Sequence, residues 1–186
     1  MSAIARRVTA EAIQIFSFAQ DCFASLAMTD DKADYSSQIT KDTDMADLTL
    51  DTARKILDAT LAKGIEKKLK PLAVIVLDAR GCLKAAAAQD GTSLMRAEVA
   101  HGKAYGALAL GLGSRALFQR AQEQAYFIDA VNTLAQGRMV PVPGGVLIMD
   151  GTTLLGAVGV SGDTSDNDEI CAIAGIEAAG LKPNAG

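Results

Sequence analysis

The sequence contains no tryptophan, and aromatic residues make up only 4% of its 186 residues. The hydrophobic core must therefore be built from alanine, leucine, valine and isoleucine, with close backbone packing in place of bulky side chains. Basic residues are also few, 18 against 22 acidic ones, and the net charge is −4. A nucleic-acid-binding surface usually carries excess positive charge, so we expect no nucleic-acid partner.

Long apolar runs are missing as well. The longest apolar stretches are well short of the roughly 20 residues that a membrane-spanning helix needs, so no membrane partner is expected. The three cysteines, Cys22, Cys82 and Cys171, are an odd number without the spacing of a metal site. This pattern argues against a disulfide framework and favours a reducing cytoplasm as the location. Cys82 and Cys171 are predicted to be small core residues.

Residues 1–44 differ in composition from the rest of the chain. The run from Ala10 to Met28 is apolar and compatible with a helix, but Glu11 and Asp21 interrupt it, which is unlike a secretion signal. The next stretch, residues 29–44, is polar and acidic, as in a disordered linker. We predict a loosely attached extension over residues 1–44 and one domain over residues 45–186.

Regular patterns of helices and strands begin near Leu48. Thr49 is suited to cap a helix over residues 50–68, where apolar residues recur at helical spacing. Two hairpins are expected, one with strands at 72–77 and 82–88, the other with strands ending at 149 and covering 154–160. Further helices are predicted at 92–110, from Ser114, at 122–135 and at 168–180. The fold class is α+β, with an antiparallel sheet built from two hairpins and flanked by helices.

Three segments together resemble the GlcG/HbpS family of haem-degrading-like proteins, which includes the carboxy-terminal domain of PduO and the DhaG-like proteins. They are Val74-Ile-Val-Leu-Asp-Ala-Arg-Gly81, Ala100-His-Gly-Lys-Ala-Tyr-Gly-Ala107, and Val142-Pro-Gly-Gly running through Gly159-Val-Ser-Gly162 to Asp168. The resemblance spans about residues 48–181. It implies an antiparallel sheet flanked by helices, homo-oligomers (octamers included), and binding or degradation of haem in some members.

The glycine signature is the first candidate for a binding role. Gly144 and Gly145 precede a strand, and Ser161 and Gly162 follow one, where glycine permits close backbone approach. Backbone N–H groups at the start of the following helix favour an anion, and Ser161 adds a hydroxyl. The alternative is a set of tight turns with a capping box, in which Asp166 caps the helix and Glu169 lies three residues on.

The helix rich in small residues carries the second candidate. Arg96 and Lys103 are seven positions apart and so project from one face, where a cationic pair suits a carboxylate or a haem propionate. Gly102 and Gly106 leave room for a ligand beside Lys103. The alternative is a solvated face or a salt bridge between subunits. Glu98 is a candidate acid or base on the same helix.

His101 is the only histidine, so any imidazole chemistry or histidine ligation of haem iron must use it. The haem-binding relatives are expected to place a histidine or another ligand nearer the first helix. In this sequence that helix, residues 50–68, contains no histidine. Tyr105 lies one turn after His101 and is a candidate to bind the iron as a phenolate. The alternative for His101 is a structural or surface role.

These residues support three hypotheses of function. In the first, the protein binds haem or a small anionic metabolite, with haem degradation as an extension. In the second, a cofactor-independent enzyme uses Arg96 and Lys103 to orient a small carboxylate and His101 or Glu98 for acid–base catalysis. In the third, the protein is purely structural and its alanine- and glycine-rich surfaces build an oligomer.

Overall fold

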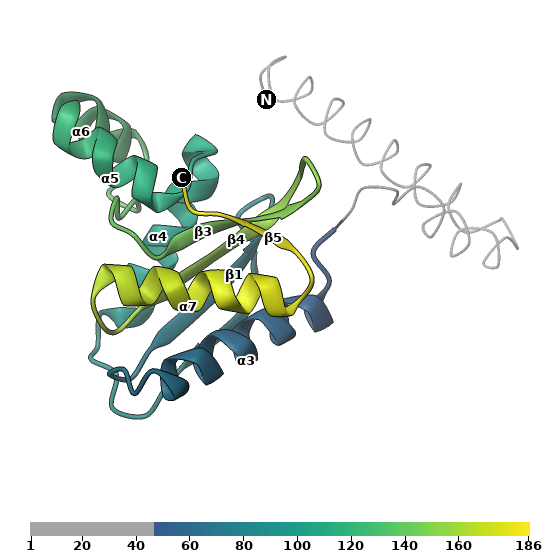
Figure 1. The fold of residues 1–186 in the computed structure, drawn as a ribbon. Helices are drawn as coiled ribbons and strands as arrows, with labels where there is room; N and C mark the ends of the chain where they lie inside the picture. The colour runs from purple at the N-terminus through teal and green to yellow at the C-terminus, as the bar shows by residue number, and fades with distance from the viewer. Residues whose placement is uncertain (1–46) are drawn as a thin grey trace, which may run out of the picture. The chain divides into compact units, whose positions relative to one another are not determined.

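The computed structural model describes residues 47–186 (Figure 1), so the prediction of an extension over residues 1–44 lies outside the described residues. In the described part five helices and five strands form a domain of the predicted α+β class. The helices are α3 (Leu50–Glu66), α4 (Arg96–Leu110), α5 (Ser114–Glu123), α6 (Ala125–Leu134) and α7 (Ser165–Ala178). The strands are β1 (Ala73–Asp78), β2 (Leu83–Ala88), β3 (Gly145–Asp150), β4 (Thr153–Ser161) and β5 (Lys182–Asn184).

One antiparallel sheet in the order β2-β1-β4-β3-β5 forms the centre of the domain. The two predicted hairpins, β1–β2 and β3–β4, are joined by pairing of β1 with β4, in which Ala73 faces Ser161 and Asp78 faces Gly156. The short strand β5 adds to the free edge of β3. The sequence pattern does not predict this strand, because three residues around a proline carry no alternation of apolar and polar side chains.

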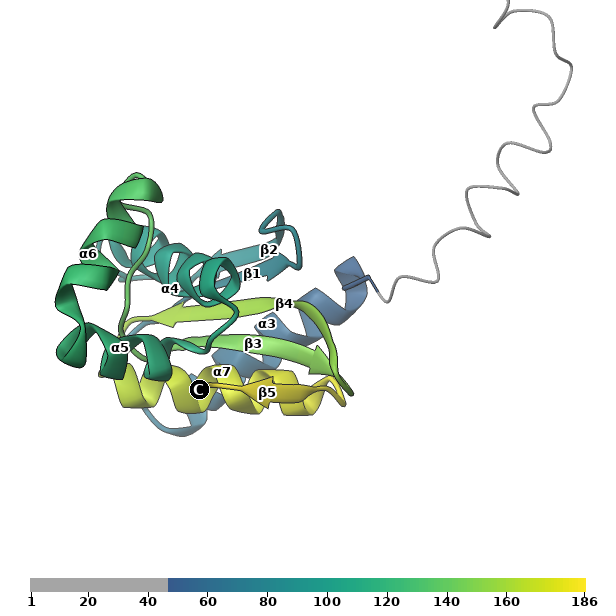
Figure 2. The same cartoon turned by 90° about the horizontal axis from the view of Figure 1, so that it is seen from above.

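The helices cover both faces of the sheet (Figures 1 and 2). α3 and α7 lie side by side on one face, and α4 lies on the other. The strand residues alternate accordingly: Val74 and Val76 point into the core under α3 and α7, while Ile75 and Leu77 point into the core under α4. β1 is therefore buried at every position, as its unbroken apolar run requires.

Small residues allow α4 to pack closely against the sheet. Ala100, Ala104 and Ala107 are fully buried against it. A Cβ atom on Gly159 of β4 would collide with the carbonyl group of Ala100, so this position requires glycine. The prediction that close backbone packing replaces bulky side chains is confirmed at this contact.

Two helix starts differ from the prediction. α4 begins at Arg96 and not at Thr92, because Thr92 bonds back to the carbonyl of Gln89 through both its amide and its hydroxyl and so belongs to a turn. α7 begins at Ser165, and its cap is Thr164, whose hydroxyl accepts a hydrogen bond from the amide of Asn167. The predicted cap at Asp166 is wrong.

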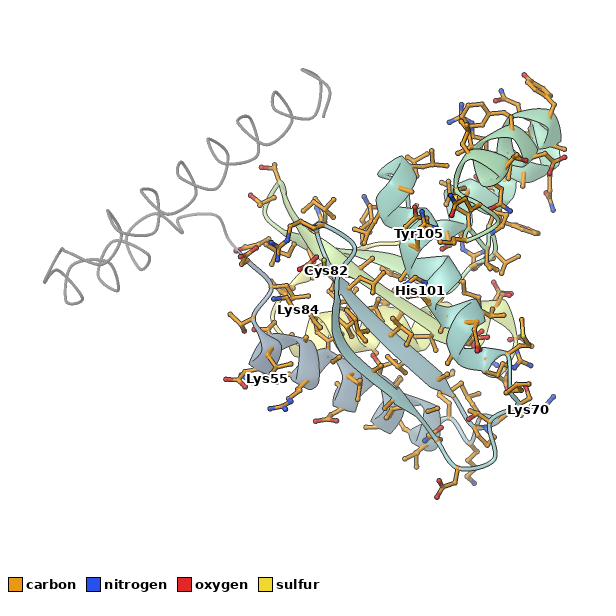
Figure 3. The ribbon with its side chains drawn as sticks, turned by 180° about the vertical axis from the view of Figure 1, so that it is seen from behind. Lys55, Lys70, Cys82, Lys84, His101 and Tyr105 are labelled. Carbon is orange, nitrogen blue, oxygen red and sulfur yellow. The ribbon has the colours of Figure 1, made fainter. Side chains whose placement is uncertain are left out.

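The cysteine prediction holds for only one residue of the described part. Cys171 is buried in α7, where burial raises the pKa of its thiol to about 11. Cys82 is exposed at the β1–β2 turn, since the following strand is an edge strand with one open side (Figure 3). Among residues 47–186 no helix is both long and apolar enough to cross a membrane.

Candidate functional site

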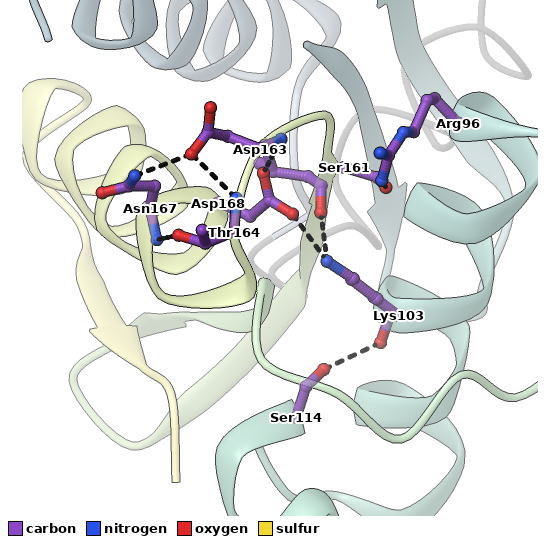
Figure 4. A network of polar contacts seen from close by, with 9 residues as sticks. Arg96, Lys103, Ser114, Ser161, Asp163, Thr164, Asn167 and Asp168 are labelled. Carbon is purple, nitrogen blue, oxygen red and sulfur yellow. Dashed lines mark hydrogen bonds and ion pairs between the residues drawn. The ribbon is translucent and has the colours of Figure 1, made fainter. Parts of the chain in front are cut away.

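The most deeply buried ion pair of the described residues joins α4 to α7 (Figure 4). Nζ of Lys103 lies 2.8 Å from Oδ2 of Asp168, and the two side chains are only 2% and 1% exposed. Lys103 also donates to the carbonyl of Val160, at 2.9 Å. The second carboxylate oxygen of Asp168 accepts from the amide of Asp163, at 3.1 Å. The pair thus connects α4, the end of β4 and the loop that leads into α7.

The glycine signature makes room for this pair. Gly144 has φ +115°, and a Cβ there would lie 2.9 Å from Nζ of Lys103 and 3.0 Å from Cβ of Asp168. A Cβ on Gly145 would collide with the carbonyl of Lys103 and the hydroxyl of Ser114, and one on Gly162 with the carbonyl of Pro71. In this structure the three glycines face packed protein atoms.

Burial opposes ionisation of both partners. It lowers the pKa of the Lys103 ammonium and raises the pKa of the Asp168 carboxyl, while their attraction and hydrogen bond act in the opposite sense. Arg96, which lies near enough to repel Lys103, also lowers the pKa of that ammonium. Two buried charges are tolerated in a fold when they pair with each other and form further hydrogen bonds. Lys103 and Asp168 do both, since Lys103 also donates to the carbonyl of Val160 and Asp168 accepts from the amide of Asp163.

Two arginines extend the polar network outwards. Nη1 of Arg96 donates to the hydroxyl of Ser161 at 3.3 Å. Arg115 on α5 bridges two carboxylates of α7, Asp166 at 2.5 Å and Glu169 at 2.8 Å, and these contacts raise the pKa of its guanidinium. The Oε2 atom of Glu169 is buried without a hydrogen-bond partner among the described residues. Charged side chains therefore join the α4, α5 and α7 helices at this end of the sheet.

A separate groove of about 480 Å³, called here the α4 groove, lies on the outer side of α4. It is open to solvent on one side. Its lining combines apolar side chains, the imidazole of His101, and two side chains of opposite charge, Glu98 and Arg138. The complete lining is Met95, Ala97, Glu98, Val99, His101, Gly137, Arg138 and Val140.

Aromatic stacking arranges the residues at one end of the α4 groove. The rings of His101 and Tyr105, one helical turn apart on α4, are nearly parallel with centroids 6.1 Å apart (Figure 3). The guanidinium of Arg138 lies over the Tyr105 ring, 4.5 Å from its centroid. This cation–π contact holds a positive charge next to the imidazole.

The segment that follows α6 forms the second wall of the α4 groove. The amide of Val140 donates to the carbonyl of Gly102, at 3.1 Å. A Cβ on Gly102 would lie 2.6 Å from the Val140 side chain, and one on Gly106 would touch Leu117 and Met139. Protein atoms thus fill the space beside Lys103 that was predicted to receive a ligand, and that prediction is wrong.

The residues predicted as functional fall into two groups. Glu98 and His101 line the α4 groove and Tyr105 stacks at its edge, whereas Arg96, Lys103 and Ser161 belong to the polar network, with Gly144, Gly145 and Gly162 packed around it. Sequence reasoning did not single out Arg138 or Val140, which lie far from α4 in the chain. It placed Asp168 in a motif but did not recognise it as the partner of Lys103.

Comparison with known proteins places this domain among established relatives. Residues 48–177 match the model of a family described as haem degrading protein HbpS-like. A curated relative in Citrobacter freundii, an uncharacterized 15.0 kDa protein in the dhaT-dhaS intergenic region, is 30% identical over 134 residues. That match covers 71% of this chain and 92% of the relative.

Solved structures share the fold. A PduOC:heme complex superposes with a TM-score of 0.66 at 23% identity, covering 73% of this chain and 96% of the other. HbpS gives a TM-score of 0.63 at 22% identity, covering 74% and 94%. Protein ORFY of Klebsiella pneumoniae gives 0.65 at 23% identity, covering 71% and 90%.

Proposed function

The chain belongs to the family described as haem degrading protein HbpS-like, and we propose that it binds haem, or another planar ligand that carries carboxylates, in the α4 groove. The observation that carries this proposal is the position of His101 beside Arg138 in a groove with apolar walls. The family description and the structural similarity to a PduOC:heme complex support haem as the ligand.

The lining of the α4 groove fits the chemistry of haem. A haem site needs an axial nitrogen, sulfur or oxygen ligand, apolar contacts for the porphyrin and cations for the propionates. His101 and Met95 offer a nitrogen and a sulfur as axial ligands, and Val99 and Val140 offer apolar contacts for the porphyrin. Arg138, whose guanidinium lies over Tyr105, offers a cation for a propionate. Bound haem supplies an iron centre whose reactivity the axial ligand and its surroundings tune.

Each polar side chain of the α4 groove has a separate proposed role in binding. His101 would hold the iron, and its ring stacks on that of Tyr105. Arg138 would neutralise a propionate. Glu98, which carries the opposite charge, is placed to accept a proton or a hydrogen bond from a bound water or ligand. The proposal is confined to binding.

The second hypothesis, in which Lys103 and Arg96 orient a small carboxylate, has weaker support. The charge of Lys103 is already paired with Asp168, and both side chains are almost completely buried. A ligand carboxylate would have to displace Asp168 and leave that charge buried without a partner, which is costly. The α4 groove presents its cation without such a displacement.

A haemin titration of the purified full-length chain tests the proposal. We expect a Soret band with saturable binding, a shifted band and at least tenfold weaker binding in His101→Ala, and weaker binding in Arg138→Gln. Arg54→Gln is the matched control, because Arg54 is exposed on α3, on the other side of the sheet from α4. Wild-type protein that shows no spectral change would contradict the proposal. A His101→Ala spectrum identical to that of the wild type would remove His101 as the ligand.

A further inference from the structure

A second hollow of about 490 Å³, called here the α6 hollow, lies at the end of α6 and is open to solvent. Its lining is polar, in contrast to that of the α4 groove, since four of its five residues have side chains that can form hydrogen bonds. The complete lining is Asp129, Asn132, Thr133, Gln136 and Gly137. The two hollows share only Gly137, so haem in the α4 groove does not account for the polar side chains of the α6 hollow.

Helical spacing gathers these polar side chains on one side of α6. The positions follow the pattern i, i+3, i+4 and i+7, which places side chains on one face of a helix, for Asp129, Asn132, Thr133 and Gln136. The turn after the helix is fixed to it by backbone hydrogen bonds. The amide of Gln136 donates to the carbonyl of Thr133 at 3.0 Å, and the amide of Gly137 donates to that of Asn132 at 2.8 Å. Helix and turn therefore form one continuous polar surface.

The backbone of Gln136 has a conformation that favours glycine. Its φ is +57°, in the left-handed region, where a side chain is unfavourable. A left-handed residue often follows a helix, but it is usually glycine. Among residues 47–186 the one other non-glycine residue with a positive φ is Lys68, after α3, and it lines neither hollow. Side chains held in such conformations are typical of ligand sites, so the carboxamide of Gln136 supports a binding role for the α6 hollow.

The lining offers both donors and acceptors. Oδ1 of Asn132 accepts from the amide of Met139 at 3.0 Å, which fixes this side chain and leaves its NH2 group to donate. The hydroxyl of Thr133 donates to the carbonyl of Asp129 at 2.8 Å, so its oxygen can accept. The Asp129 carboxylate, which forms no ion pair within residues 47–186, can only accept, and the Gln136 carboxamide can do both.

These groups discriminate between classes of ligand. The Asp129 carboxylate would repel an anion. A small cation would suit Asp129 but would leave the amide donors of Asn132 and Gln136 without an acceptor. A flat apolar ligand would meet no apolar side chain in this lining. A hydroxyl group both donates and accepts, so a ligand with several neighbouring hydroxyls matches all four polar side chains.

We propose that the α6 hollow is a second binding site, for a neutral polyhydroxylated compound such as a sugar or a polyol. Asp129 accepts hydrogen bonds from the hydroxyls of this ligand, Asn132 donates to them, and Gln136 does both. The site is separate from the α4 groove, and the proposal does not depend on whether that groove binds haem.

Two-dimensional proton–nitrogen NMR of the full-length chain, titrated with maltose and with myo-inositol, tests the site. We expect saturable shifts of the backbone amides of residues 129–138 with at least one of these probes. Acetate and methylammonium, which carry opposite charges, should leave the same amides unshifted. If neither maltose nor myo-inositol causes saturable shifts there, the proposal is overturned. Saturable shifts with acetate or methylammonium alone would overturn the class of ligand.

Replacement of Gln136 separates a binding role from a structural one. Gln136→Gly removes the carboxamide but suits the left-handed backbone, so the melting temperature should stay the same or rise. Binding of the probe should weaken about tenfold or more, as expected for lost hydrogen bonds. Lys68→Gly is the matched control, because it makes the same backbone change at an exposed position after α3 and should leave binding unchanged.

Asp129→Ala gives an independent measurement at the same site. Asp129 is exposed on α6, where alanine favours the helix, so this variant should fold normally and bind the probe about tenfold more weakly or worse. Binding by Gln136→Gly or Asp129→Ala that equals binding by Lys68→Gly overturns the proposal. A loss of binding in Gln136→Gly that accompanies a lower melting temperature counts against a direct contact of Gln136 with the ligand.

Discussion

Lys103 of α4 and Asp168 of α7 form an ion pair across the end of the sheet, with 2.8 Å between Nζ and Oδ2 and almost no exposure to solvent. The two residues are 65 positions apart in the chain. Since the pair also engages the carbonyl of Val160 and the amide of Asp163, it fixes the position of α4 relative to β4 and α7. The position of α4 in turn sets the α4 groove on its outer side.

Breaking this pair from one side should destabilise the domain strongly. Lys103→Met leaves the Asp168 carboxylate buried without its cation, which typically costs about 3–5 kcal/mol of unfolding free energy. The double variant Lys103→Met/Asp168→Asn removes both charges and should recover a large part of that loss. Urea unfolding followed by circular dichroism measures both. Equal stabilities for the single and double variants would refute the view that the unpaired charge is the cause.

Asp163 should make stability depend on acid pH. Hydrogen bonds from the Asn167 side chain and the amides of Thr164 and Lys70 lower the pKa of this carboxyl from 3.8 to about 2. A carboxyl with a lower pKa in the folded state adds stability above its unfolded pKa and loses it as the pH falls through the folded value.

The stability difference between the wild type and Asp163→Asn should therefore be largest above about pH 4 and shrink towards about pH 2, the interval between the unfolded and folded pKa values. Urea unfolding at a series of pH values gives this difference directly. A difference that stays constant over the whole range would show that the charge of Asp163 has no part in it.

Two glycines on α4 should respond in opposite ways to replacement by alanine. Gly102→Ala places a Cβ against Val140 and the carbonyl of Arg138, so the wall of the α4 groove must shift, and such overpacking commonly costs about 1–3 kcal/mol. Gly106→Ala makes only ordinary contacts and should be neutral or stabilising by up to about 1 kcal/mol, since alanine favours a helix. Thermal unfolding compares the two. If Gly102→Ala proves as stable as Gly106→Ala, the segment at 138–140 is not a fixed wall.

The cap of α7 should respond to replacement of Thr164. Thr164→Ala removes the oxygen that accepts from the amide of Asn167 and should cost about 1 kcal/mol of unfolding free energy. Asp166→Ala removes only an exposed pair with Arg115, and a surface pair contributes about 0–1 kcal/mol. Chemical unfolding at neutral pH distinguishes them, and a larger loss in Asp166→Ala would support Asp166 as the cap.

Local patterns were sufficient to predict most of the fold. The apolar run at 72–77, rich in β-branched residues, and the Asp150-Gly151 turn indicated the two hairpins, because strand and turn preferences act over a few residues. The starts of α4 and α7 were misjudged where several residues able to cap or turn follow one another. The hydrogen bonds in the folded domain decide which of these residues turns the chain and which caps the helix. The Thr92 hydroxyl donates to the carbonyl of Gln89, and the Asn167 amide donates to the hydroxyl of Thr164.

The sequence by itself determined that this is an α+β domain whose core is made of small and aliphatic side chains, since composition and periodicity are local properties of the chain. Only the tertiary structure decided what Lys103 does. Its spacing from Arg96 was visible in the sequence, but its carboxylate partner lies 65 residues away and reaches it through folding of the sheet between α4 and α7. The α4 groove depended on the same kind of long-range contact, because Arg138 meets Tyr105 only when the chain after α6 returns along α4.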